Sequence, residues 1–155
     1  MLNTLVLNSL HQKNIPAVSI APHLIMRLNN HSLADMNYDI FKECLNKDFI
    51  PVTFGDVVFD EKLGFSICSG DLLIKVLTEY FKPEKVVFVM DEDGIYTSNP
   101  KVDKNAEFID EISTKDFHSL TASMDNHADV TGGMRGKLQT IQKTVSYTHL
   151  RAHET

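Results

Sequence analysis

Apolar residues recur along the chain with two different spacings, and these predict helices and strands in alternation. Apolar positions three to four residues apart predict helices at 1–14, 36–47, 70–81, 114–124 and 134–143. Short continuous apolar runs predict buried strands at 16–22, 49–54 and 85–90. The runs at 57–59 and 65–68 flank the turn sequence DEKLG and predict a β-hairpin. Strands that alternate with helices predict an α/β fold with a mainly parallel sheet.

The composition narrows the class of protein. The 155 residues are 43% hydrophobic and 23% charged, which is typical of one globular domain. A net charge of −6 argues against nucleic-acid or anionic-membrane binding but is compatible with the binding of a small anion. No apolar run has the length of a membrane span, and the N-terminus lacks the features of a signal peptide. Cys44 and Cys68 have no metal-ligand spacing and fit a reducing cytosol, so we expect a cytoplasmic protein without a metal site of its own.

The two ends of the chain differ in character from its middle. The N-terminal helix has no N-cap residue, so we expect residue 1 to lie inside a truncated helix rather than at the natural start of one. Residues 145–155, VSYTHLRAHET, have no apolar period and resemble a sequencing adapter translated in one frame. We therefore expect a partial domain over 1–144 and a non-native read-through tail over 145–155. A genuine polar tail is the alternative.

An acidic segment follows the apolar run at 85–90. Ligands of open α/β sheets bind beyond the carboxyl ends of the strands, where Asp91 is expected to lie. A carboxylate there can orient a cation or a lysine, Asp93 and Gly94 make a turn, and Tyr96 can offer its ring to a base. The alternative is a plain Asp-Gly turn after a strand.

A glycine pair precedes the last predicted helix. Gly132 and Gly133 would let backbone N–H groups approach phosphate oxygens, and the helix N-terminus adds partial positive charge. Lys137 follows one turn later and could reach the same anion. The spacing is not that of a Walker loop, and a simple connecting loop is the alternative.

A second candidate anion site combines two turns. Gly55 and Asp56 follow one predicted strand, and Ser69, Gly70 and Asp71 open the helix at 70–81. Ser69 and the free N–H groups of that helix could hold a phosphate. The alternatives are an ordinary N-cap at Ser69 and solvated turn carboxylates at Asp56 and Asp71.

Taken together, these segments resemble the amino acid kinase superfamily, and most closely its isopentenyl phosphate kinase branch. The resemblance rests on four stretches that match in order and spacing: NIPAVSIAP, FIPVTFGDVVFDEKLGFSICSGD, VVFVMDEDGIYTSNPK and ADVTGGMRGKL. It implies a three-layer αβα sandwich, here incomplete, and a cytoplasmic, homodimeric enzyme. Such an enzyme transfers the γ-phosphoryl of ATP, with Mg²⁺, to isopentenyl phosphate for isoprenoid synthesis.

The resemblance also implies roles for the candidate residues. Asp91 corresponds to the carboxylate that orients a catalytic lysine, and further nucleotide contacts are implied for Asp93, Gly94, Tyr96, Gly132, Gly133 and Lys137. Gly55 corresponds to a contact with the substrate phosphate, and Asp56, Ser69, Gly70 and Asp71 would shape that end of the site.

The chain departs from the family at several places. Met90 stands where the family usually has Thr, and residues 1–35 contain neither the Lys and Gly-Gly-Ser strand nor the His-Gly-Gly-Gly segment. We therefore expect this chain to be inactive alone. Alternative functions are another phosphotransferase of the superfamily, with an amino acid, nucleotide or phosphonate acceptor, or a non-catalytic nucleotide-binding module.

Overall fold

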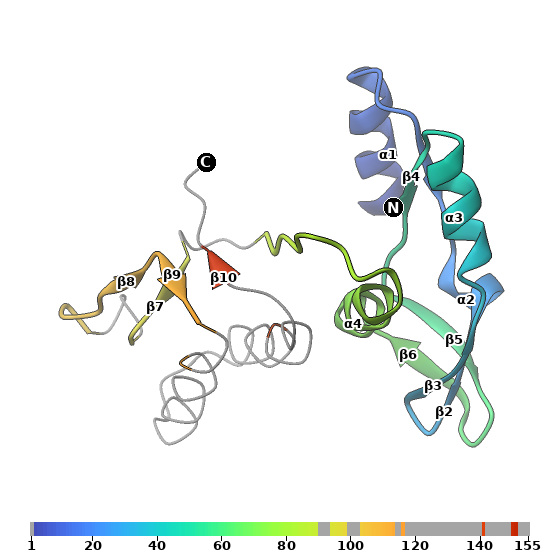
Figure 1. Cartoon of the computed structure of the whole chain (residues 1–155). Coiled ribbons are helices and arrows are strands. Elements are labelled where there is room, and N and C mark those ends of the chain that lie inside the picture. The colour runs from blue at the N-terminus through green and yellow to red at the C-terminus, as the bar shows by residue number, and fades with distance from the viewer. Residues whose placement is uncertain are drawn as a thin grey trace. The chain divides into compact units, whose positions relative to one another are not determined.

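The chain folds into two compact units, Met1–Leu73 and Ile74–Thr155, which we describe separately. A computed structural model describes residues 2–89, 94–98, 103–113, 116 and 141, together with the backbone of 150–151 (Figure 1). The elements of the first unit are α1 (Leu2–Gln12), β1 (Ala17–Ser19), α2 (Pro22–Ile25), β2 (Met26–Asn29), β3 (Ser32–Met36), α3 (Asp39–Asn46), β4 (Ile50–Val52), β5 (Asp56–Asp60) and β6 (Gly64–Cys68). Helix α4 (Gly70–Phe81) begins in this unit and continues into the second.

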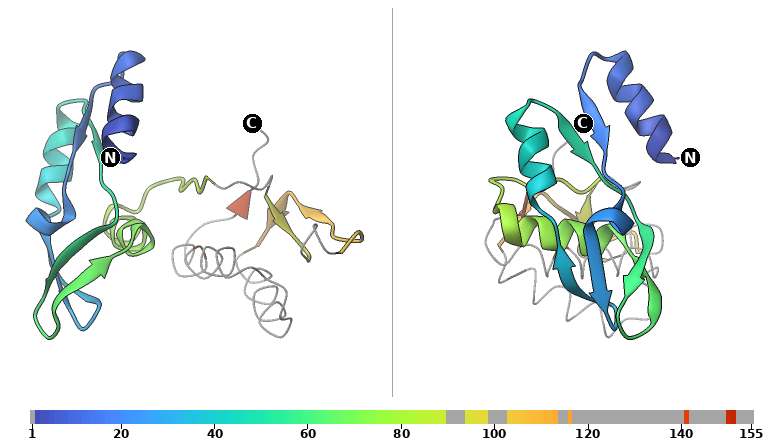
Figure 2. Two further views of the ribbon diagram at one scale, coloured as in Figure 1. Left: turned by 180° about the vertical axis from the view of Figure 1, so that it is seen from behind. Right: turned by 90° about the vertical axis from the view of Figure 1, so that its right-hand side faces the viewer.

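Strands β1 and β4 form a parallel pair at one end of the first unit, with Ala17 opposite Ile50. The pair lies between α1, which contacts β1, and α3, which contacts β4 (Figure 2). Asn3 Nδ2 of α1 donates a hydrogen bond to Ser19 Oγ at 2.6 Å, and His11 Nε2 donates one to the Ala17 carbonyl oxygen at 2.8 Å. Two short strands are thus held in place by a helix on each side.

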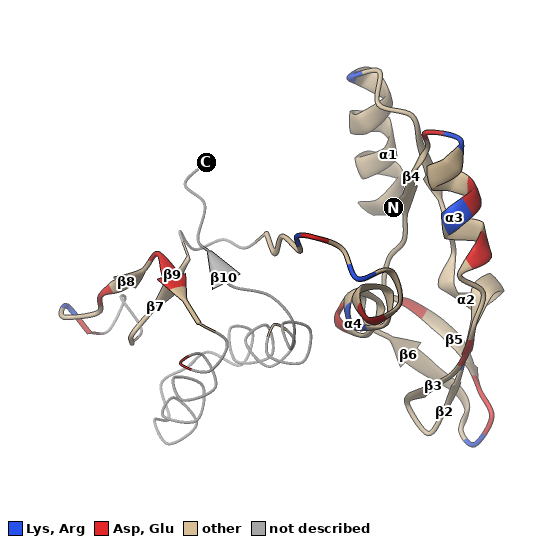
Figure 3. Cartoon of the chain, viewed as in Figure 1, with Lys and Arg blue, Asp and Glu red and all other residues tan. Residues whose placement is uncertain are grey.

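The two flanking helices differ in the charged residues that they carry. Helix α1 has no Lys, Arg, Asp or Glu, whereas α3 carries both signs of charge (Figure 3). In α3, Lys42 Nζ lies 2.9 Å from Asp39 Oδ1, three residues earlier. The apolar stripe expected at the N-terminus is present in α1, but it leaves Leu2 and Leu5 exposed.

The second sheet has the order β3-β2-β5-β6 and consists of two antiparallel hairpins. The hairpins meet through a parallel contact of β2 with β5, where Leu28 lies opposite Asp60. Alternate residues of β5 and β6 point to opposite faces of the sheet. One face is buried, and its members are Val58, Asp60, Ser66 and Cys68. The other face is exposed and apolar, with Val57, Phe59, Phe65 and Ile67.

Asp60 joins the turns of the two hairpins. Its buried carboxylate accepts the backbone N–H groups of Asn30 and His31 at 2.9 Å each, in the β2–β3 turn. It also accepts the N–H groups of Lys62 and Leu63 and the hydroxyl of Ser66 from its own hairpin. Burial raises the pKa of Asp60, but these hydrogen bonds outweigh burial and hold that pKa well below its usual range. Asp60 is therefore ionised and fixes the register of both turns.

The described part of the second unit contains the rest of α4 and two short antiparallel pairs. Strand β7 (Ile95–Tyr96) pairs with β8 (Phe108–Ile109), and β9 (Glu111–Ile112) pairs with β10 (Leu150–Arg151). Ile141 is helical and buried. None of the described helices is long and apolar enough to cross a membrane.

Several predicted elements are confirmed, some of them with changed bounds. The α/β class, the N-terminal helix, the helix at 70–81 and the hairpin over 57–68 are present. The strands expected at 16–22 and 49–54 shrink to β1 and β4, and neither is buried on both faces, since Val18 and Ile50 are exposed. The described pairings are mixed rather than mainly parallel, because each hairpin adds an antiparallel pair.

Other predictions are wrong. The strand expected at 85–90 is not formed over 85–89, where Val87 and Val89 are exposed, because no described strand pairs with this run. The helix expected at 36–47 begins at Asp39, since Met36 belongs to β3. Helix α2 and the β2–β3 hairpin were not predicted. The helices expected at 114–124 and 134–143 lie outside the described residues, apart from the single helical positions 116 and 141.

Candidate functional site

The candidate acceptor end of the first unit is formed where the turn before β5 meets the start of α4. A Cβ added at Gly55 would lie 3.3 Å from the Cys68 carbonyl oxygen and 3.6 Å from the Gly70 nitrogen. Gly55, Ser69 and Gly70 are all exposed. The structure therefore brings together Gly55 and the Ser69-Gly70 pair, which are far apart in the sequence, at a surface open to ligands.

Helix α4 begins with the cap that the sequence predicts. Ser69 Oγ accepts the N–H of Leu72 at 3.1 Å, and the Ser69 carbonyl oxygen accepts the N–H of Leu73. Asp71 is exposed in the first turn. The first N–H groups of a helix have no partner within it and carry partial positive charge, so this end of α4 can hold an anion. Thr53 Oγ1, just before the Gly55 turn, is buried without a hydrogen-bond partner among the described residues.

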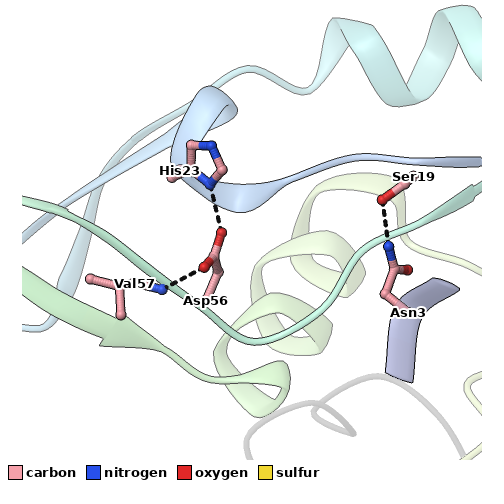
Figure 4. A network of polar contacts seen from close by, with 5 residues as sticks. All are labelled: Asn3, Ser19, His23, Asp56 and Val57. Carbon is pink, nitrogen blue, oxygen red and sulfur yellow. Dashed lines mark hydrogen bonds and ion pairs between the residues drawn. The ribbon is translucent and has the colours of Figure 1, made fainter. Parts of the chain in front are cut away.

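Asp56 lies beside Gly55 at the start of β5 and contacts a residue that the sequence did not indicate. Its Oδ2 lies 2.7 Å from His23 Nδ1 in α2, and its Oδ1 accepts the N–H of Val57 at 2.9 Å (Figure 4). The hydrogen bond from His23 lowers the pKa of Asp56, against a smaller opposing effect of burial. Asp56 is therefore a fixed, ionised carboxylate and not a freely solvated one, and 26% of its side chain is exposed.

Cys68 lies opposite Asp56 in the β5–β6 pair and is fully buried. Burial, and then the nearby Asp56 charge, raise the pKa of Cys68 to about 11. The thiol is neutral at physiological pH and serves packing rather than nucleophilic chemistry. Both cysteines are free.

The candidate nucleotide end lies in the second unit, where Gly94 precedes β7 and Tyr96 lies within it. The Tyr96 ring meets Phe108 of β8 edge to face, with ring centroids 5.4 Å apart. The β7–β8 pair is extended by the Thr97 N–H, which donates to the Glu107 carbonyl oxygen at 2.9 Å. Tyr96 is thus held half-buried by its hairpin, and one side of its ring is used for packing.

The other candidate residues for the nucleotide lie outside the described residues. These are Asp91, Asp93, Gly132, Gly133 and Lys137. Their roles therefore stay predictions. Among the residues that the structure does describe, no group of three His, Cys, Asp or Glu side chains could hold a metal ion.

Comparison with known proteins gives a consistent result. A model of the "Amino acid kinase family" matches residues 1–146. The isopentenyl phosphate kinase of Methanothermobacter thermautotrophicus is 37% identical over 143 residues, which cover 90% of this chain and 53% of the relative. That of Methanocaldococcus jannaschii is 33% identical over 144 residues, or 91% of this chain and 52% of the relative.

The fold is similar to that of solved structures as well. An X-ray structure of isopentenyl phosphate kinase matches with a TM-score of 0.66 and 30% identity, and the match covers 89% of this chain and 61% of that one. The chain spans about half the length of the curated relatives it matches. The resemblance that the four sequence stretches indicate is confirmed.

Proposed function

The chain belongs to the amino acid kinase family, and from this premise we propose that it is part of a kinase that phosphorylates isopentenyl phosphate. The reaction would transfer the γ-phosphoryl of ATP to the phosphate monoester and give isopentenyl diphosphate and ADP. The observation that carries the proposal is the 37% identity with an isopentenyl phosphate kinase over nine-tenths of the chain.

The acceptor end supports this proposal through its chemistry. Phosphoryl transfer depends on positioning and charge neutralisation more than on covalent chemistry. Gly55 permits the close approach of a turn to the start of α4, where N–H groups favour an anion. We assign the acceptor phosphate to Gly55, Ser69 and Gly70, with Asp56 and Asp71 at its margin.

The nucleotide end is assigned to Gly94 and Tyr96 together with the candidates outside the described residues. Gly132, Gly133 and Lys137 would contact the ATP phosphates, and Asp91 would orient a catalytic lysine. Mg²⁺ would be bound together with ATP and would supply charge neutralisation of its phosphates during transfer. We further propose a cytoplasmic homodimer.

An acceptor panel tests the function. The whole protein of which this chain is a part would be incubated with ATP, Mg²⁺ and one acceptor at a time: isopentenyl phosphate, an acidic amino acid, a nucleoside monophosphate or a phosphonate. We expect ADP and isopentenyl diphosphate to form in equal amounts when isopentenyl phosphate is the acceptor, and no product to form with the other acceptors. Both products are measured by ³¹P NMR. The 155-residue chain is the matched control and is expected to be inactive. Turnover of another acceptor would replace the proposal with a different kinase, and turnover of none would favour a nucleotide-binding module.

A further inference from the structure

A histidine from a distant segment reaches the candidate acceptor end. His23 belongs to α2 and Asp56 to β5, 33 residues apart, and Figure 4 shows the imidazole directed at the carboxylate. The His23 Nδ1 to Asp56 Oδ2 distance of 2.7 Å is that of a charge-assisted hydrogen bond. The side chain of His23 is 49% exposed, so the ring lies at a surface that a ligand can reach.

The contact defines which ring nitrogen carries hydrogen. An ionised carboxylate only accepts hydrogen bonds, so His23 Nδ1 must donate, in either the neutral or the cationic ring. The second oxygen of Asp56 is occupied by the Val57 N–H. Both oxygens of Asp56 are therefore held by α2 and by its own strand.

The charges of this region give a hydrogen-bond donor to Asp56 a possible use. Residues 53–57 and 68–73, which form the acceptor end, contain Asp56 and Asp71 but no Lys or Arg. Cys68, opposite Asp56, contributes no charge because its thiol is protonated. A phosphate monoester dianion brought to Gly55 would be repelled by these two carboxylates. His23 is the side chain, among the described contacts of Asp56, that donates a hydrogen bond to this carboxylate.

We propose that His23 is a positioning residue for the acceptor phosphate: its imidazole N–H holds the Asp56 carboxylate in place and satisfies one of its oxygens, so that a dianion can approach Gly55 and the first turn of α4. The inference rests on the proposed function, because only an anionic acceptor would be repelled by the Asp56 carboxylate. It assigns to His23 a role that its sequence position does not indicate.

Steady-state kinetics of the whole protein test the role. His23→Ala removes the hydrogen bond to Asp56, and we expect the KM for isopentenyl phosphate to rise roughly fivefold, the net effect typical of one hydrogen bond. The kcat and the KM for ATP are expected to stay within about twofold, because only acceptor binding is affected. His23→Asn keeps a neutral N–H near the Nδ1 position and should show a smaller rise. His31→Asn is the matched control, since the side chain of His31 is exposed and Asn tolerates its φ of 66°.

A double-mutant cycle separates this role from a general structural one. In an Asp56→Asn protein the carboxylate charge is gone, so adding His23→Ala should leave the KM for isopentenyl phosphate unchanged. An equal rise in both backgrounds, or a loss of kcat with unchanged KM, would overturn the proposal.

The inference can be decided even if the proposed function fails. If the wild-type protein does not phosphorylate isopentenyl phosphate, inorganic phosphate is titrated into it while the amide signals of Gly55 and Gly70 are followed by NMR. Weaker phosphate binding in His23→Ala supports the role of His23. Equal binding in both proteins, or no response at either amide, overturns it.

Discussion

Gly55→Ala is the substitution that tests the candidate acceptor end most sharply. The new methyl group would lie 3.3 Å from the Cys68 carbonyl oxygen and 3.6 Å from the Gly70 nitrogen. The first distance is a few tenths of an ångström shorter than a comfortable contact, and both neighbours are backbone atoms. Relief therefore requires the end of β6 or the start of α4 to move.

The expected magnitudes separate stability from binding. Mild overpacking destabilises by about 1 kcal/mol, and replacing Gly by Ala restricts the unfolded chain by about 0.4–1 kcal/mol in the opposite sense. The free energy of unfolding should thus change by less than about 1 kcal/mol. Weakening one hydrogen bond to the acceptor phosphate is worth about 1.5 kcal/mol, or roughly tenfold in the KM for isopentenyl phosphate.

Gly64→Ala is the matched control in the β5–β6 turn. Gly64 has a φ of 80° and open space around it, so alanine there is strained but touches nothing. We expect Gly64→Ala to lose about 1 kcal/mol of stability in urea unfolding and to keep the wild-type KM. A wild-type KM in Gly55→Ala, or an equal rise in both variants, would refute the placement of the acceptor phosphate at Gly55.

Three further predictions concern single side chains. Ser69→Ala removes the cap of α4 and should lower the free energy of unfolding by about 1 kcal/mol in urea titrations, whereas an unchanged midpoint would contradict the capping role. The pKa of Asp60 is lowered on folding, so its stabilisation is complete at neutral pH and is lost as the pH falls below about 4. Asp60→Asn should therefore have a lower urea midpoint than wild type at pH 7, and the difference should narrow in acid. Iodoacetamide at pH 8 should label Cys44 well before Cys68, whose pKa is raised to about 11. The labelling is measured by mass spectrometry, and equal rates at the two cysteines would contradict the burial of Cys68.

Elements with strong local signals were predictable from the sequence. The apolar stripe of the first helix and the Ser69 cap act within a few residues, so they favour α1 and α4 independently of the rest of the fold. The hairpin of β5 and β6 follows from alternation around a turn, although the turn occupies 61–63 rather than all of DEKLG.

Elements that depend on partners were not predictable. The run at 85–89 has the composition of a buried strand, but a strand forms only when another strand supplies its hydrogen bonds. The β2–β3 hairpin was missed because its turn uses Asn30 and His31 at positive φ, with no glycine or proline to mark it. That turn is stabilised by Asp60, which is distant in the sequence.

The same difference between local signals and long-range contacts applies to the candidate site. Gly55, Ser69 and Gly70 could be chosen from turn and cap signals, and the structure brings them together. The contact of His23 with Asp56 spans 33 residues and has no motif, so only the fold reveals it.

The most direct test of the central claim is a crystal structure of the whole protein with a non-hydrolysable ATP analogue and isopentenyl phosphate. We expect the acceptor phosphate within about 3 Å of the backbone nitrogens of Gly55 and Gly70, and the nucleotide phosphates beside Gly133 and Lys137. An acceptor phosphate seated away from Gly55, or a nucleotide that does not touch Gly133 and Lys137, would contradict the assignment of both ends of the site.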